Sequence, residues 1–291
     1  MSILPVGLTL LSAFTHASWN FLATKSHETD QLLHSGILII SIGLIPAFII
    51  GLYGVSFPIR VWRNIPISGF FLAIYYFGLI QGYRSGEFTV VYPIARALPV
   101  LIIALSDIVR GFPPTTLGWA GIFLVAIGLI MSPLDSVRSF SLSTYKNKAT
   151  LWAILAAIGI TGYSFIDSVS ADMMQPGVST ALRYFVFQTF FSIVIYLFIL
   201  RSLPTPIHWA KGWAGWRRPA VIGLLVTCGY TLVILAYQLT SETSYVVALR
   251  QFSIVIGVLM AAMLLREAVP KLRILAAFII TSGVFIIALA G

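Results

Sequence analysis

The chain has 291 residues, of which 59% are hydrophobic and 9% charged, and its mean hydropathy is +0.97. Soluble domains have roughly 45–50% apolar and about 25% charged residues, so this composition excludes a soluble globular protein and indicates an integral membrane protein. The formal net charge of +9 does not indicate nucleic-acid binding, because the Lys and Arg residues fall between apolar segments, as in multi-pass membrane proteins.

Apolar segments of about 20 residues follow one another along nearly the whole chain. A membrane β-barrel would show shorter, alternating segments, so each long segment predicts a transmembrane helix. The first segment lacks a basic start and a small-residue cleavage site, so we expect it to remain as a helix. The sequence predicts an all-α protein with ten transmembrane helices, at 3–24, 31–53, 66–83, 88–109, 115–132, 149–172, 180–200, 218–239, 243–265 and 273–290.

Basic residues are distributed unevenly over the connections between these segments. The even-numbered connections hold only Arg60, Arg63, Arg110 and Arg183. By the positive-inside rule the odd-numbered connections are predicted to face the cytoplasm and both termini the outside. Those connections hold Lys25, Arg84, Arg138, Lys146, Lys148, Arg201, Lys211, Arg217, Arg218, Arg266, Lys271 and Arg273.

The residues that could support metal or nucleophilic chemistry are scattered. The single cysteine, Cys228, lies inside the eighth segment, and the four histidines do not have the spacing of metal ligands. The sequence also lacks a His-Glu-x-x-His or paired-aspartate motif. We therefore expect no metal, no cofactor and no enzymatic activity.

The two halves of the chain are weakly similar to each other. A shift of 155 residues superposes "YYFGLIQGYRSGEFTVVYPIAR" on "YTLVILAYQLTSETSYVVALRQ". The shift pairs Tyr75 with Tyr230, Glu87 with Glu242, Val91 with Val246, Val100 with Val255 and Gly128 with Gly283. Five helices per half is an odd number, so the second half is predicted to be inverted in the membrane, as in alternating-access carriers. The repeats would span residues 1–134 and 149–291.

The segment "SETSYVVALRQFSIVIGVLMAAMLLREAVPKLRILAAFIITSGVFII", residues 241–287, with Glu267 in "LREAVP" and Gly283, resembles the EamA-type branch of the drug/metabolite transporter superfamily. The resemblance covers the whole chain as a five-plus-five inverted repeat, although Gly111 stands in the first half where Glu267 stands in the second. It implies a secondary transporter of small metabolites, often amino acids or related compounds, in the bacterial cell inner membrane. The stretch "HASWNFLATKS", residues 16–26, is similar to a subgroup of which some members accompany phosphonate-utilisation genes.

Two arginines lie deep inside predicted helices. Arg96 follows Glu87 by nine residues and Arg250 follows Glu242 by eight. At about 1.5 Å per residue each lies roughly 12–14 Å into its helix, close to the middle of a roughly 30 Å hydrocarbon core. An arginine at that depth is costly, so we expect both to face a cavity or a counter-ion. They are predicted to bind an anionic group of a substrate; internal ion pairs with Asp107 or Asp167 are the alternative.

Other candidate residues follow helical spacing. His16, Trp19 and Asn20 lie on one face of the first helix with Ser12, and Tyr75 and Tyr230 are the matched pair of the two halves. All of them except Ser12 are predicted to contact substrate. Polar groups also hold helices together, which is the alternative role. Pro93 and Pro99 are expected to kink the fourth helix or to serve its packing, since each removes a backbone donor.

Asp167 is the acidic residue predicted to lie farthest inside a helix, and His16 is the other titratable candidate. We expect Asp167 to take up a proton in one half of a transport cycle. The sequence thus favours a secondary transporter for a small anionic or zwitterionic metabolite such as an amino acid, organic acid or phosphonate-like compound, acting as a monomer or homodimer. A flippase for a lipid or lipid-linked headgroup is the alternative, because it would share nearly all of these features.

Overall fold

The computed structural model describes residues 2–24, 31–84, 88–132, 134, 148–204, 207–264 and 270–290. Every regular element in these ranges is a helix. The helices are α1 (Ile3–Thr24), α2 (Gln31–Tyr53), α3 (Ile59–Arg84), α4 (Phe88–Val109), α5 (Thr116–Met131), α6 (Lys148–Ala171), α7 (Val178–Arg201), α8 (Gly212–Tyr237), α9 (Thr243–Arg250), α10 (Phe252–Leu264) and α11 (Lys271–Ala290).

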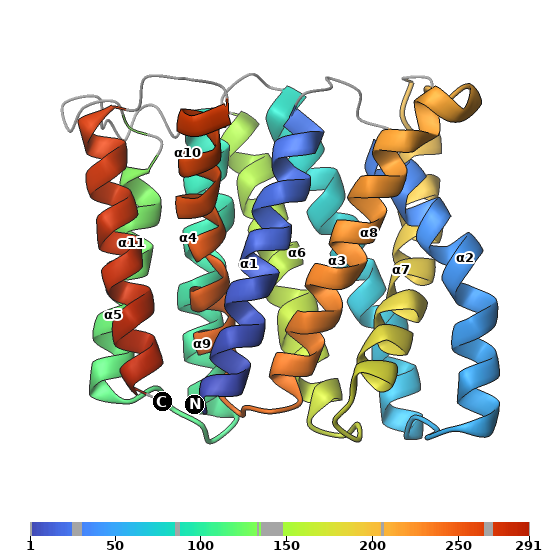
Figure 1. The fold of residues 1–291 in the computed structure, drawn as a ribbon, viewed down its shortest axis with the longest axis horizontal. Coiled ribbons are helices and arrows are strands. Elements are labelled where there is room, and N and C mark those ends of the chain that lie inside the picture. Colours follow the sequence, from blue (N-terminus) through green and yellow to red (C-terminus); the bar gives the residue numbers. More distant parts are fainter. Residues whose placement is uncertain are drawn as a thin grey trace.

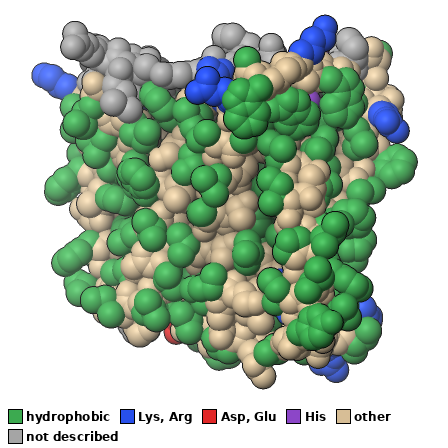
Figure 2. Space-filling model, turned by 45° about the vertical axis from the view of Figure 1, so that its right-hand side comes forward, with side chains coloured by type: hydrophobic (Ala, Val, Ile, Leu, Met, Phe, Trp, Pro, Cys, Tyr) green, Lys and Arg blue, Asp and Glu red, His purple; other side chains and the backbone are tan. Residues whose placement is uncertain are grey.

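Many of these helices have the length and polarity of membrane spans. Within the described ranges, 7 stretches of helix are long and apolar enough to cross a membrane, and α5 is a shorter apolar helix. On the face shown in Figure 2, hydrophobic side chains cover the middle of the molecule, and Lys and Arg side chains lie toward its two ends. The prediction of a multi-pass helical membrane protein is confirmed at this level.

The helices run side by side along one common direction (Figure 1). Both chain termini lie at the same end of the bundle, together with the turns between α2 and α3, α4 and α5, α6 and α7, and α8 and α9. The odd-numbered connections therefore start and finish at the opposite end. This arrangement fits the predicted alternation of the chain across the membrane; which end faces the cytoplasm stays a prediction.

Two predicted helices begin earlier in the chain than expected. α3 begins at Ile59 where the prediction began at 66, and α8 begins at Gly212 where the prediction began at 218. Each has a proline inside the helix, Pro66 in α3 and Pro219 in α8. The hydropathy pattern missed the first turns because they carry charged residues, which are compatible with a helix end at the membrane surface.

The ninth predicted helix is two helices, α9 and α10, divided at Gln251. The backbone N–H of Gln251 bonds to the carbonyl of Ala248, three residues back, at 3.0 Å. The side-chain amide of Gln251 instead donates to the carbonyl of Val247, which a continuous α-helix would pair with the Gln251 backbone N–H, at 3.1 Å. The side chain thus replaces a backbone bond, and the helix axis is interrupted one residue after Arg250.

Small residues allow α5 and α11 to pack closely, at the left of Figure 1. A Cβ atom added to Gly283 would lie 2.7 Å from the carbonyl oxygen of Gly121, and one added to Gly121 would lie 2.8 Å from that of Gly283. Gly128, the sequence counterpart of Gly283, lies against Ala276 of α11 in the same way. Close backbone approach at small residues is a common way to pack helices in membranes.

Pro93 and Pro99 both lie inside α4, which continues as helix through them. They therefore do not end the helix, and the expected kink stays a prediction. Glu87 and Glu267 lie outside the described residues.

Candidate anion site

Arg96, Arg250 and His16 meet inside the bundle. Nη2 of Arg96 lies 2.6 Å from Nε2 of His16, and Nη2 of Arg250 lies 3.3 Å from Nδ1 of the same ring. α4 and α9 start at opposite ends of the bundle (Figure 1). Their arginines nevertheless reach the same imidazole on α1. The two charges therefore lie at similar depth, as the sequence predicts.

The hydrogen-bonding capacity of His16 does not match its neighbours. The indole N–H of Trp19 points at His16 Nδ1 at 3.1 Å, so the ring faces N–H donors from three side chains. Guanidinium and indole groups only donate, and a neutral imidazole has one accepting nitrogen. At least one ring nitrogen is thus a donor that faces another donor. An oxyanion would accept from all of these groups, since its oxygens carry lone pairs and no hydrogen.

The surroundings of Arg250 also favour an anion. Its Nε is buried and makes no hydrogen bond with the described residues, and none of them places a carboxylate within ion-pair distance of it. Its guanidinium carbon lies 5.4 Å from the ring centroid of Tyr230, close enough for a cation–π interaction. A buried guanidinium with an unused donor is a site at which a charge-assisted hydrogen bond to a ligand is favourable.

Two small chambers adjoin these residues. The aromatic chamber, of about 30 Å³, is bounded by His16 and Arg250 and by Trp19, Tyr75, Tyr76, Tyr163, Phe185 and Tyr230. The polar chamber, of about 10 Å³, is bounded by His16, Tyr75, Tyr163 and Arg250 together with Arg96, Ser164 and Gln251. A single water needs about 10–15 Å³. The structure is therefore a closed form in which side chains have to move before a metabolite fits.

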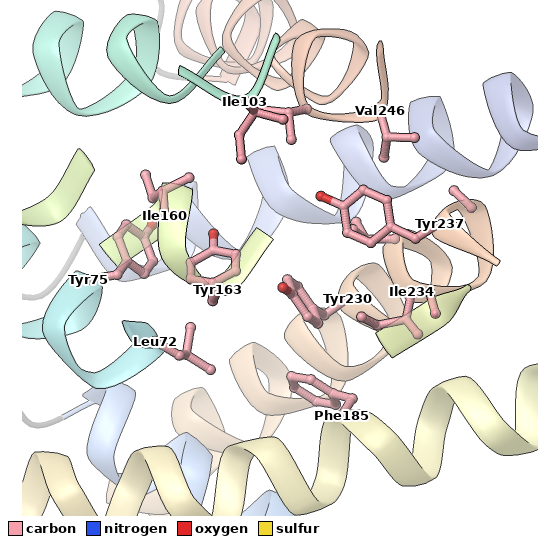
Figure 3. Packing of buried hydrophobic residues seen from close by; sticks show 14 of the residues in the cluster. Leu72, Tyr75, Ile103, Ile160, Tyr163, Phe185, Tyr230, Ile234, Tyr237 and Val246 are labelled. Carbon is pink, nitrogen blue, oxygen red and sulfur yellow. The ribbon is translucent and has the colours of Figure 1, made fainter. Parts of the chain in front are cut away.

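Tyrosines from several helices surround the same interior space (Figure 3). Tyr75 of α3, Tyr163 of α6 and Tyr230 of α8 form a chain of edge-to-face contacts with centroid separations of 5.9 and 5.8 Å. Tyr237 lies two turns beyond Tyr230 on α8 and faces the same space. Aromatic rings with polar tips can contact both the apolar and the polar parts of a ligand.

Asp167 is fully buried at the junction of α3, α6, α7 and α8. Its carboxylate accepts hydrogen bonds from the hydroxyls of Ser68 and Tyr230, from the Tyr184 hydroxyl at 2.7 Å, and from Gln188 Nε2 at 2.9 and 3.1 Å. All four donors are neutral. Tyr230 also borders the aromatic chamber, so one side chain joins Asp167 to the candidate anion site.

The acids proposed as alternative ion-pair partners are engaged elsewhere. Asp107 forms an ion pair with Arg110 at 3.2 Å and accepts the backbone N–H of Ser244, near the start of α9, at 2.7 Å. Arg110 also pairs with Asp172 at 2.6 Å and bonds to Thr243. The described bonds of Asp167 come from the four side chains given above. Neither acid supplies a described contact to Arg96 or Arg250.

The structure brings most of the predicted site residues together. His16, Trp19, Tyr75, Tyr230, Arg96 and Arg250 border one or both chambers. Asn20 borders neither: it is half-buried and its side chain donates to the carbonyl of His16 at 2.8 Å. The amide of Asn20 is thus used within α1 in this closed form. Asp167 is set back behind Tyr230.

Several residues of the site were missed by the sequence analysis. Tyr163 lies one turn before Asp167 on α6, and this spacing was a signal that could have identified it. Gln251, next to Arg250, contacts Arg96 through a long 3.4 Å hydrogen bond. Ser68, Tyr184 and Gln188 come from helices whose relative rotation the sequence does not give. No periodic pattern distinguishes them from other polar residues that join helices.

The fold and site together define a multi-pass α-helical membrane protein with buried basic groups around an internal space. Comparisons with known proteins support the fold. One solved structure, described as "Crystal structure of protein", has a TM-score of 0.71 and 16% sequence identity, over 99% of this chain and 96% of the other. At this identity the likeness concerns the fold alone. Searches of protein-family models and of curated proteins gave no match.

Proposed function

We propose that this chain is a secondary transporter of a small organic anion or zwitterion, of the EamA type that its sequence resembles, working in a bacterial inner membrane. The observation that carries this proposal is the meeting of Arg96 and Arg250 at His16, with the buried, unused Nε of Arg250 beside two chambers. Arginines in the interior of a membrane protein are costly and mark substrate or ion sites. Binding an anion in the middle of the bundle is what a carrier requires.

The packing of the helices supports an inverted repeat. α3 packs on α6 and α7, and α8, its counterpart in the second half, packs on α1 and α2. In the same way α4 packs on α6, while α9 and α10 pack on α1, and α5 packs on α11. Contacts between the halves thus come in matched pairs. Rocking of one half against the other would expose the site to each side of the membrane in turn.

Asp167 is the proposed coupling residue. A carboxylate in a membrane interior that lacks a described basic partner is costly when charged, so uptake of a proton gives it a second stable state. Tyr230 would couple the protonation state of Asp167 to the anion site, because its hydroxyl bonds to Asp167 and its ring lies by Arg250. The proposal therefore predicts that Asp167 takes up a proton when the protein binds substrate.

The experiment is a thermal-shift screen of the purified protein against amino acids, organic acids, phosphate and phosphonate compounds and lipid headgroups. A compound that binds only the folded protein at 100 times its Kd stabilises it by about 2.7 kcal/mol. We expect a small soluble anion or zwitterion to stabilise the wild type and to undergo counterflow in proteoliposomes. Stabilisation by lipid headgroups alone would favour the flippase alternative, and stabilisation by none of the compounds would contradict the proposal.

A further inference from the structure

The two chambers that His16 borders differ in chemistry. The polar chamber is bordered by both arginines and by the amide of Gln251. The aromatic chamber has the rings of Tyr76 and Phe185 and the aliphatic side chains of Leu72, Leu225 and Val226 at its walls. His16 and Arg250 border both chambers. A ligand that occupied both would have a charged head in the polar chamber and an apolar body in the aromatic chamber.

Among the residues that the structure describes, those bordering the two chambers include no acidic side chain. The buried Asp167 borders neither chamber, Tyr230 lies between it and the aromatic chamber, and its described hydrogen bonds come from four neutral groups. The ammonium group of an amino acid would therefore meet no carboxylate from the described lining residues, and it would stand near the guanidinium of Arg250, a like charge. Like charges held close together in a low-dielectric interior repel strongly.

We propose that the site takes an amphiphilic organic anion without a free ammonium group: an oxyanion head, carboxylate or phosphoryl, in the polar chamber and an apolar or aromatic body in the aromatic chamber. The inference rests on the proposed transporter function and narrows its substrate class. On binding, the head takes the place of the His16 ring beside Arg250, and the two chambers merge. The excess of donors around His16 in the closed form is then satisfied by the oxyanion.

The test compares matched compounds by thermal shift and calorimetry on the purified full-length protein. 3-Phenylpropanoate and L-phenylalanine differ by an α-ammonium group, propanoate lacks the ring, and phenyl phosphate replaces the carboxylate head. We expect at least one ring-bearing anion to bind ten times or more tighter than both phenylalanine and propanoate. Equal or tighter binding of phenylalanine, equal binding of propanoate, or binding of neither ring-bearing anion would overturn the inference.

Two variants on α8 test the place of the apolar body. Val226→Trp fills the aromatic chamber, and we expect it to weaken binding of the ring-bearing anion at least tenfold, while a cooperative melting transition in detergent shows that the variant is folded. Leu224→Trp is the matched control, because Leu224 is 64% exposed on the outer side of the same helix. No effect of Val226→Trp, or an equal effect of Leu224→Trp, would contradict the assignment of this chamber.

Failure of the inference can be told apart from failure of the proposed function. A zwitterion that binds more tightly than its ammonium-free counterpart, and that loses binding in Arg250→Ala, would overturn the inference and leave the anion-site transporter standing. A ligand whose binding and transport are unchanged by Arg250→Ala would overturn the proposed function itself.

Discussion

The guanidinium carbon of Arg250 lies 5.4 Å from the ring centroid of Tyr230. The hydroxyl of the same tyrosine donates to the buried carboxylate of Asp167. One rigid side chain therefore contacts both the candidate anion site and the candidate coupling residue. A change at either end alters the position that the ring prefers, which gives a physical route between binding and protonation.

The Tyr230→Phe variant separates these two contacts. It keeps the ring beside Arg250 and removes the hydrogen bond to Asp167. We expect substrate affinity to change less than threefold, whereas accumulation driven by a pH difference in proteoliposomes falls at least tenfold. Tyr163→Phe is the control, because Tyr163 borders both chambers and has no described bond to Asp167. Equal losses in the two variants would show that Tyr230 has no special part in coupling.

Asp167→Asn tests proton coupling directly. The amide cannot take up and release a proton at neutral pH, so we expect the variant to lose accumulation driven by a pH difference. Counterflow exchange of labelled substrate needs no driving force and is expected to continue. Should the variant still accumulate substrate with only a pH difference imposed, Asp167 is not the coupling residue, and exchange or facilitated diffusion describes the transport.

Because α5 packs closely on α11, a larger side chain at this contact is expected to destabilise the protein more than the same side chain at an uncrowded glycine. In Gly283→Leu the new Cβ would lie 2.7 Å from the backbone oxygen of Gly121, so the helices have to separate. We expect a loss of at least about 2 kcal/mol of stability, the range of overpacked cores, seen as a lower Tm in detergent. Gly257→Leu is the control, because nothing lies within 4 Å of its added Cβ. An equal Tm for both variants would contradict the described packing.

The sequence predicts the approximate positions of most helices because hydropathy is a local property. It also predicts that Arg96 and Arg250 lie at similar depth, since the depth of each follows from counting residues, but not that both contact His16. It does not predict the break at Gln251, where one side-chain amide competes with the backbone for the Val247 carbonyl. Nor does it predict the donors to Asp167, because Ser68, Tyr184 and Gln188 meet only once helix rotations are known.

The orientation of the bundle is predicted from the basic residues alone. In a Cys228→Ala background, cysteines placed at Ser141 and Thr205 are expected to resist an impermeant maleimide in intact cells, because both fall in odd-numbered connections. A cysteine at the exposed Val55, between α2 and α3, is expected to react. The reverse pattern of labelling would mean that the odd-numbered connections face outward.

The central claim is that the guanidiniums of Arg96 and Arg250, on helices that start at opposite ends of the bundle, bind the anionic group of a substrate. Once the screen has identified a ligand, the most direct measurement is its Kd, by calorimetry, for Arg96→Ala, Arg250→Ala and Arg250→Lys beside an exposed control, Arg218→Ala. We expect each alanine variant to remain folded and to bind at least 100-fold more weakly, which corresponds to about 2.7 kcal/mol. Lysine at position 250 is expected to recover little, because a point charge lacks the planar fork of donors. Wild-type affinity in both alanine variants would contradict the claim and show that the two arginines serve the structure alone.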